Sequence, residues 1–161
     1  MVEIRGVTKS FFDGARRVEV LRGIDLTIEA GERVAIVGAS GAGKTTFMHI
    51  VGGLDHPTSG DVLYQGKDIF SLTGPALDAF RNRTIGFVFQ FHQLLPEFSA
   101  LENVMMPALI ASQGLKKAAP LAEGLLREDG LGHRLTHKPG QLSGGVQQRW
   151  AIALSLAMSP K

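Results

Sequence analysis

The sequence predicts an α/β fold of the P-loop nucleotide-binding class, and three neighbouring features predict it. The mostly apolar residues 33–37 are typical of a buried parallel strand. Directly after them, Gly38-Ala39-Ser40-Gly41-Ala42-Gly43-Lys44-Thr45-Thr46 fits the phosphate-binding pattern GxxxxGK(S/T) without a mismatch. Residues 46–51 have the composition of a helix. Strand, glycine loop and helix in this order form the structural context that the motif requires.

The loop residues have distinct chemical roles in such a site. Gly38, Gly41 and Gly43 allow backbone turns that residues with a Cβ avoid, so that successive N–H groups can point at one anion. Lys44 supplies a cation for the β- and γ-phosphates, and Thr45 offers a hydroxyl to Mg²⁺. The following helix turns its positive dipole end toward the phosphates. The alternative is a glycine-rich surface turn that matches by chance, and the flanking strand and helix argue against it.

Composition and charge exclude several other classes of protein. The chain of 161 residues is 44% apolar and 20% charged, which suits one globular domain rather than a disordered chain. Its formal net charge of +2 is too small, and its charges too scattered, to favour nucleic acid as a partner. Cysteine is absent, which excludes disulfides and thiolate metal sites and is compatible with a reducing cytoplasm.

The same sequence is not expected to cross a membrane. Its first residues lack the apolar core of a secretory signal. The longest apolar runs, at 104–111 and 150–158, fall short of the roughly eighteen residues that a membrane helix needs. Docking on a membrane protein remains open.

The residues before the P-loop predict a small antiparallel sheet. Residues 2–7 and 18–21 have strand composition, and Asp13-Gly14 between them is a turn signal. Residues 24–28 are predicted to form a further strand, followed by a turn that leads into the P-loop strand.

Two aromatic residues, Phe11 and Phe12, stand just before that turn. Either can stack on an adenine ring, whereas an aromatic residue in a strand more often belongs to the core.

The segment after the P-loop helix predicts a continuation of this sheet and a second buried strand. Residues 61–64 alternate as a half-buried strand does, and 77–83 are predicted to form a short helix. Residues 85–89 have the composition of a buried strand that ends on Gln90. A glutamine there can ligate a metal or orient a water, although at a strand end it is more often simply solvated.

The following residues predict a helical region. Ser99 can cap a helix, with Glu102 three residues later completing a capping box, after an unusually apolar loop at 94–99. A second helix is predicted at 116–128.

Two more features precede the carboxyl end. His133 and His137 lie four residues apart, a separation that suits a shared metal, but the sequence offers no third ligand nearby and surface histidines are the better interpretation. Leu142-Ser143-Gly144-Gly145 opens a helix that runs to Met158. This is a second potential phosphate-binding helix end, or only an N-cap.

The P-loop, Gln90 and the stretch 142–149 stand in an order that resembles the nucleotide-binding subunits of ABC transporters, over residues 1–161. The resemblance implies an N-terminal antiparallel β subdomain and a helical subdomain that, with the Gln90 loop, covers about 86–145. It also implies ATP and Mg²⁺ as cofactors, with Thr45 and Gln90 contacting the metal and Phe11 stacking on adenine. The nucleotide-binding residues implied by the motifs and the resemblance are Phe11, Gly38, Ser40, Gly41, Gly43, Lys44, Thr45, Thr46, Gln90, Ser143, Gly144 and Gly145.

The resemblance also implies partners. Gln90 would sense an integral membrane permease, and residues 143–145 would close on the γ-phosphate held by a second ATPase subunit in a head-to-tail dimer. Residues 91–104 look most like the ATPases of bacterial lipoprotein-releasing systems, which act peripherally at the cytoplasmic face of the inner membrane. His92 and Glu97-Phe98 carry most of this likeness. Macrolide-exporter ATPases are close relatives and are the alternative, and generic loop packing would also account for those residues.

The resemblance implies that Ser143, Gly144 and Gly145 are the family signature, and three residues of the helix that follows depart from the family pattern. Val146 stands where Glu is usual, Trp150 where a small aliphatic residue is usual, and Leu154 where Arg is usual. These departures leave the contacts of that helix open, though not the role of its glycines.

The sequence ends at Lys161, where the family continues into the Walker B strand. The Asp for Mg²⁺ and the catalytic Glu would lie in that later part, so no catalytic residue is assigned here. The resemblance also implies that the strands lying between 34–37 and 85–89 come from sequence beyond Lys161, which would leave both runs as unpaired edges. We therefore expect residues 1–161 alone neither to hydrolyse ATP nor to fold as a stable monomer. The alternatives are a module that binds nucleotide without hydrolysing it, and another P-loop enzyme such as a kinase or GTPase, which would need neither Gln90 nor the signature.

Overall fold

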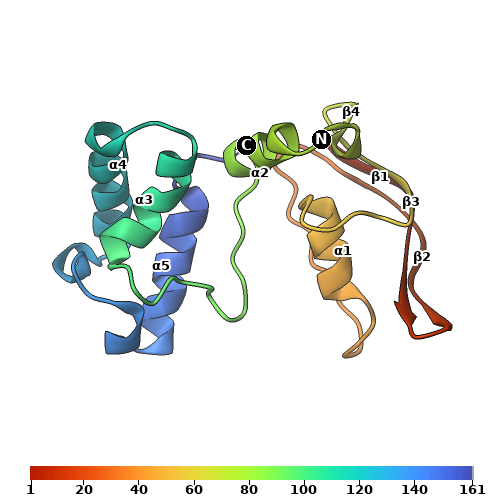
Figure 1. Cartoon of the computed structure of the whole chain (residues 1–161), viewed down its shortest axis with the longest axis horizontal. Helices are drawn as coiled ribbons and strands as arrows, with labels where there is room; N and C mark the ends of the chain where they lie inside the picture. Colours follow the sequence, from red (N-terminus) through yellow and green to blue (C-terminus); the bar gives the residue numbers. More distant parts are fainter. Residues whose placement is uncertain (161) are drawn as a thin grey trace. The chain divides into compact units, whose positions relative to one another are not determined.

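A computed structural model describes residues 1–160, which form two compact units (Figure 1). The first unit is Met1–Leu77 and the second begins at Asp78, so that the division falls within helix α2 (Pro75–Thr84). The first unit contains the sheet and the P-loop helix, and the second is helical. Among residues 1–160, no helix is both long enough and apolar enough to cross a bilayer.

The sheet of the first unit is antiparallel throughout, with strand order β2-β1-β3-β4. Its strands are β1 (Val2–Asp13), β2 (Arg16–Ile28), β3 (Ser59–Tyr64) and β4 (Lys67–Asp68). Asp13 pairs with Arg16 across the tight turn, which confirms the predicted hairpin. The separate strand predicted at 24–28 is wrong, because β2 continues through it. Irregularities in the β1–β2 register let both strands bend without breaking.

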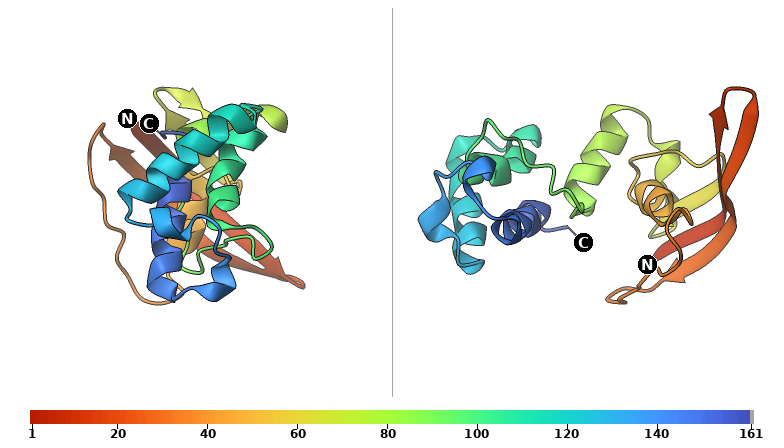
Figure 2. Two further views of the ribbon diagram at one scale, coloured as in Figure 1. Left: turned by 90° about the vertical axis from the view of Figure 1, so that its left-hand side faces the viewer. Right: turned by 90° about the horizontal axis from the view of Figure 1, so that it is seen from below.

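Helix α1 (Lys44–Val51) packs against one face of this sheet (Figure 2). Because alternate strand residues point to one face, the sheet and the helix can bury a common apolar layer. Its buried members include Ile4, Val7, Leu21, Val62, Phe47 and Ile50. The Tyr64 hydroxyl donates to the Val51 carbonyl at 2.9 Å, which ties β3 to the end of α1. Burial raises the pKa of Tyr64 to about 12, so this phenol remains a donor at neutral pH.

The two predicted buried strands, 34–37 and 85–89, are not strands in the structure. Neither joins the sheet, and Val37 is 87% exposed. A strand in the middle of a parallel sheet needs a neighbour for its N–H and C=O groups, and no strand within residues 1–160 pairs with either segment. Residues 85–90 nevertheless alternate between half-buried and exposed, and the Phe87 and Phe89 rings stack with centroids 5.4 Å apart. The local pattern of a strand is therefore present without a sheet.

The second unit packs three helices around a core of small residues. They are α3 (Ala100–Ile110), α4 (Leu115–Glu128) and α5 (Gly144–Leu156). The core contains six buried alanines, which let the helices approach closely, and one fully buried Trp150. The predicted helices are confirmed to within about two residues, the usual uncertainty of a helix end. Short 3-10 turns stand at Gly132–Arg134 and Pro139–Gln141, and a third, Ile69–Ser71, belongs to the first unit.

Candidate functional site

The glycine loop takes the backbone conformation that its sequence predicts. Gly41 and Gly43 have φ angles of 78° and 88°, in the left-handed region that favours glycine. Gly43 is the N-cap of α1, and a Cβ there would lie 2.9 Å from Val20 Cγ1 and 3.0 Å from Leu21 Cδ2 of β2. Position 43 therefore requires glycine both for its φ angle and for its close packing on the sheet.

Lys44 lies against the loop that it follows. Its ammonium donates to the carbonyl of Gly38 at 2.8 Å and to that of Ala39 at 2.6 Å. An ammonium has three N–H donors, so one remains for a phosphate oxygen. Thr45 is exposed beside it, and the first turn of α1 contains no acidic residue. The start of α1 thus offers positive charge and a hydroxyl with no carboxylate to oppose an anion.

The remaining loop residues belong to the same turn. Ser40 is exposed, and Thr46 is half-buried in the first turn of α1. The structure therefore brings the predicted phosphate-binding residues 38–46 together at one helix end.

Phe11 and Phe12 are both on the surface, so the interpretation of either as a core residue is wrong. Their exposed fractions are 43% and 75%. The two differ in their surroundings, because the Lys9 ammonium lies 5.0 Å from the centre of the Phe11 ring. Of the two, Phe11 is thus the ring that a neighbour holds in place.

Gln90 is exposed in the second unit, at a turn after residues 85–89. Its predicted position at a strand end is wrong in this structure, because residues 85–89 have no strand partner within residues 1–160. Gly86 lies close to the end of α5, since a Cβ on it would clash with the Ser155 carbonyl oxygen.

The loop after Gln90 is held by one side chain that the sequence reasoning did not identify. Asn103 is buried in α3, and its amide oxygen accepts from the Leu95 N–H at 2.8 Å. Its amide nitrogen donates to the carbonyls of Leu95, Phe98 and Ser99 at 3.0–3.1 Å. The signal that was available is a lone polar residue at a core position of an apolar helix, since buried amides require partners.

A capping box fixes the start of α3, as predicted. Ser99 Oγ accepts from the Glu102 N–H at 3.3 Å, and Glu102 Oε2 accepts from the Ser99 N–H at 2.8 Å. The backbone hydrogen bond from Ser99, and next the one from its hydroxyl, lower the pKa of Glu102. This box and Asn103 together define the conformation of the loop.

The signature residues lie at the amino end of α5. Ser143, Gly144 and Gly145 are exposed. Ser143 takes the N-cap position, but its side chain makes no capping hydrogen bond, and its hydroxyl has no partner within residues 1–160. Its hydroxyl and the first N–H groups of α5 are therefore able to meet an anion.

The three departures from the family pattern share one face of α5. Val146, Trp150 and Leu154 are spaced four residues apart, and all three pack in or against the helical core. The departures thus alter the core side of the helix and not its exposed glycine end.

The two histidines, His133 and His137, have different surroundings. The Nε2 of His137 lies 3.2 Å from an Arg134 guanidinium nitrogen, and His133 is exposed. Within the described residues, no three metal-ligating side chains gather.

Comparison with known proteins gives close matches. A family model described as "ABC transporter" matches residues 21–161. The chain is 66% identical over 161 residues to the lipoprotein-releasing system ATP-binding protein LolD of Syntrophotalea carbinolica, covering 100% of this chain and 71% of that relative. It is 52% identical over 160 residues to LolD of Myxococcus xanthus, covering 99% of this chain and 71% of that relative.

Solved structures are similar as well. The dimeric ATP-binding cassette MJ0796, bound to ADP and Pi after hydrolysis, matches with a TM-score of 0.92 at 40% sequence identity. The match covers 99% of this chain and 71% of that chain.

The capping box makes stability depend on pH in a way that one substitution tests. Because the pKa of Glu102 is lowered on folding, its contribution is full above the ordinary glutamate pKa of about 4.3 and is lost as the pH falls through the lowered value. Glu102→Gln keeps an acceptor oxygen but does not titrate. In a chain extended with the residues that follow the matched region of the Syntrophotalea carbinolica relative, we expect urea unfolding between about pH 6 and pH 3 to depend less on pH with Glu102→Gln than without it. Glu97→Gln, which changes an exposed glutamate of the same loop, is the control, and equal pH dependence in both variants would contradict the assignment.

Proposed function

The chain belongs to the ABC transporter family, and we propose that it is the ATP-binding subunit of a lipoprotein-releasing transporter. The observation that carries the proposal is the P-loop, where the Lys44 ammonium lies against a glycine turn packed on the sheet. The LolD relatives from Syntrophotalea carbinolica, Syntrophus aciditrophicus and Myxococcus xanthus, at 66%, 59% and 52% identity, favour this subfamily over the macrolide-exporter alternative.

In this proposal the triphosphate of ATP lies against the backbone N–H groups of the P-loop, with Lys44 contacting the β- and γ-phosphates. The Thr45 hydroxyl on α1 would hold Mg²⁺, which would supply positive charge beside the phosphates. Family membership supports Gln90 as a further oxygen ligand. Phe11 stacks on the adenine ring through its exposed face.

The signature at the start of α5 is proposed to act on a second copy of the subunit. Ser143, Gly144 and Gly145 present a hydroxyl and uncapped N–H groups to the outside. In a head-to-tail dimer each signature covers the P-loop of the other subunit, so that two ATP sites lie at the interface.

The loop 91–98 is proposed to dock on an integral membrane permease. It exposes Phe91, Leu95 and Phe98, and Phe91 is 83% exposed. Clustered exposed apolar residues usually mark a contact surface. Such docking would place the subunit peripherally at the cytoplasmic face of the bacterial inner membrane.

Nucleotide binding is tested by removing the P-loop ammonium. We expect Lys44→Ala to weaken MgATP binding by about 1.5 to 3 kcal/mol, the magnitude of a charge-assisted hydrogen bond. Calorimetric titration measures this, with the parent chain and the variant each extended by the residues that follow the matched region of the Syntrophotalea carbinolica relative. Lys67→Ala removes an exposed lysine of β4 in the same unit and is the matched control. Equal affinity in Lys44→Ala and the parent chain would refute the site.

Hydrolysis is tested with a chimaera that joins residues 1–161 to the residues of the Syntrophotalea carbinolica relative that follow the matched region. Residues 1–161 contain no carboxylate that the family assigns to the attacking water, and phosphoryl transfer depends on positioning and charge. We expect ATPase activity near background from 1–161 and sustained activity from the chimaera. The chimaera should also protect the amides of 34–37 and 85–89 from hydrogen exchange, because buried strands need partners. Sustained ATPase activity with a sharp cooperative melt from 1–161 would contradict both expectations.

Action of the signature in trans is tested by mixing two inactive chimaeras. One carries Lys44→Ala and the other Gly144→Asp, which places a carboxylate where phosphate would bind. Nothing lies within 4 Å of a Cβ at Gly144, so the substitution fits the helix. A mixed dimer retains one intact composite site if the signature acts in trans, and we expect mixing to restore ATPase activity. No recovery would indicate that each signature serves its own P-loop.

A further inference from the structure

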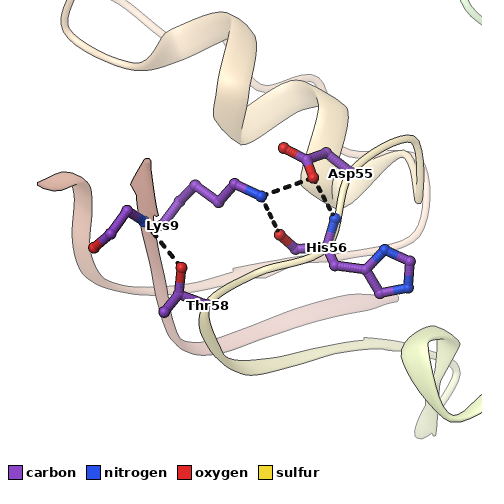
Figure 3. Close-up of polar contacts among 5 residues, drawn as sticks. Lys9, Asp55, His56 and Thr58 are labelled. Carbon is purple, nitrogen blue, oxygen red and sulfur yellow. Dashed lines mark hydrogen bonds and ion pairs between the residues drawn. The ribbon is translucent and has the colours of Figure 1, made fainter. Parts of the chain in front are cut away.

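Lys9 of β1 is a lysine that the nucleotide-binding motifs leave unassigned and that the structure nearly buries. Its side chain is only 12% exposed. Its ammonium donates to Asp55 Oδ1 and to the His56 carbonyl, both at 2.7 Å (Figure 3). Lysine is rarely withdrawn from water unless it is paired, so these two bonds account for its burial.

The segment that Lys9 holds is the loop that follows the P-loop helix. Asp55 lies four residues after the end of α1, and its Oδ1 also accepts from the His56 N–H at 2.7 Å. The loop is fastened to β1 beside Lys9 as well. Thr58 Oγ1 accepts from the Ser10 N–H at 2.9 Å. Lys9 is therefore the centre of a cross-link between β1 and the carboxyl end of the helix that carries Lys44 at its start.

The same ammonium also holds an aromatic ring. It lies over Phe11 at 5.0 Å from the ring centroid, within the range of a cation–π contact. Phe11 keeps 43% of its surface exposed, which leaves room for a second ring to stack. Phe12, its neighbour in sequence, has no ring or cation contact within residues 1–160. A single cation thus orients one of two adjacent rings.

We propose that Lys9 is a positioning residue for the base of the nucleotide. It holds the Phe11 ring in the orientation that stacks on adenine, and it anchors that ring to the end of the P-loop helix. This inference rests on the proposed binding of ATP. Fixing the ring before the ligand arrives removes an entropic cost from binding, which strengthens the interaction with the base but not with the phosphates.

A purely structural role for the ion pair makes a different prediction. If Lys9 only braced the loop at 55–58, its loss would disturb α1 and with it the phosphate site. Binding of a ligand without a base would then weaken as much as binding of ATP. The comparison of MgATP with magnesium tripolyphosphate, which has the phosphates and no base, separates the two roles.

The experiment is calorimetric titration of both ligands into the parent chain, Lys9→Met and Lys9→Arg. We expect Lys9→Met to weaken MgATP binding about fivefold, with tripolyphosphate binding changed less than about twofold. Lys9→Arg should restore most of the ATP affinity, since a guanidinium both stacks on rings and pairs with carboxylates. Lys67→Met is the control for removing a lysine from this sheet. The titrations are repeated in the chimaera described above, so that poor folding of a variant of the shorter chain does not decide the result.

A double substitution tests the route through the ring. In a Phe11→Leu background, Lys9→Met should cost no further ATP affinity, because the two residues act as one unit. The inference would be overturned if Lys9→Met weakened the binding of both ligands equally or of neither, or if the losses of ATP affinity were additive in the double variant. The proposal that this chain binds ATP would stand in each of these cases. A parent chain and chimaera that bind neither ligand would overturn the proposed function itself, and this inference with it.

Discussion

The close packing of Gly43 on strand β2 is the constraint on which the nucleotide site depends. The glycine begins α1 in a left-handed conformation, and even a methyl group there would contact Val20 at 2.9 Å. Helix α1 then buries Phe47 and Ile50 against the sheet. The loop, the helix and the sheet are therefore one packed body, so the start of α1, where we propose that the phosphates bind, is held in place before any ligand binds. Such preorganisation avoids the cost of ordering the loop on binding.

The second unit also contains a helix that is anchored in a core and has an exposed, glycine-containing start. Helix α5 is anchored in the core by Trp150, and its start exposes Ser143 and two glycines. Val146, Trp150 and Leu154, which depart from the pattern that the resemblance implies, all lie in or against this core. The exposed end retains the family residues. This separation explains how the helix can depart from the family pattern without losing the signature.

The sequence predicted those features that depend on local chemistry. The hairpin at Asp13-Gly14, the capping box at Ser99 and the glycine loop are each determined by a few adjacent residues, and the structure contains all three. The ABC-type fold is likewise confirmed by the family match and by solved structures. The prediction of buried strands at 34–37 and 85–89 was wrong, because a strand forms only beside a partner strand. Apolar composition does not say whether such a partner is present.

The sequence alone did not identify the contacts of Lys9 and Asn103, because their partners are distant in the chain or belong to the backbone. Lys9 binds Asp55, which lies 46 residues later, and no local pattern connects them. Asn103 binds the backbone of a loop, and backbone partners leave no mark on the sequence. Only the structure shows that these two polar side chains are largely withdrawn from solvent. Long-range polar contacts of this kind are what a single sequence reveals least.

The central claim is that the glycine loop at the start of α1 is the binding site for the phosphates of ATP. Backbone amide NMR shifts measured during titration with MgATP test it most directly, because they report on the N–H groups themselves. We expect the amides of Gly41, Gly43, Lys44 and Thr45 to shift most and to saturate together. Saturable binding of MgATP that leaves these four amides unchanged would contradict it.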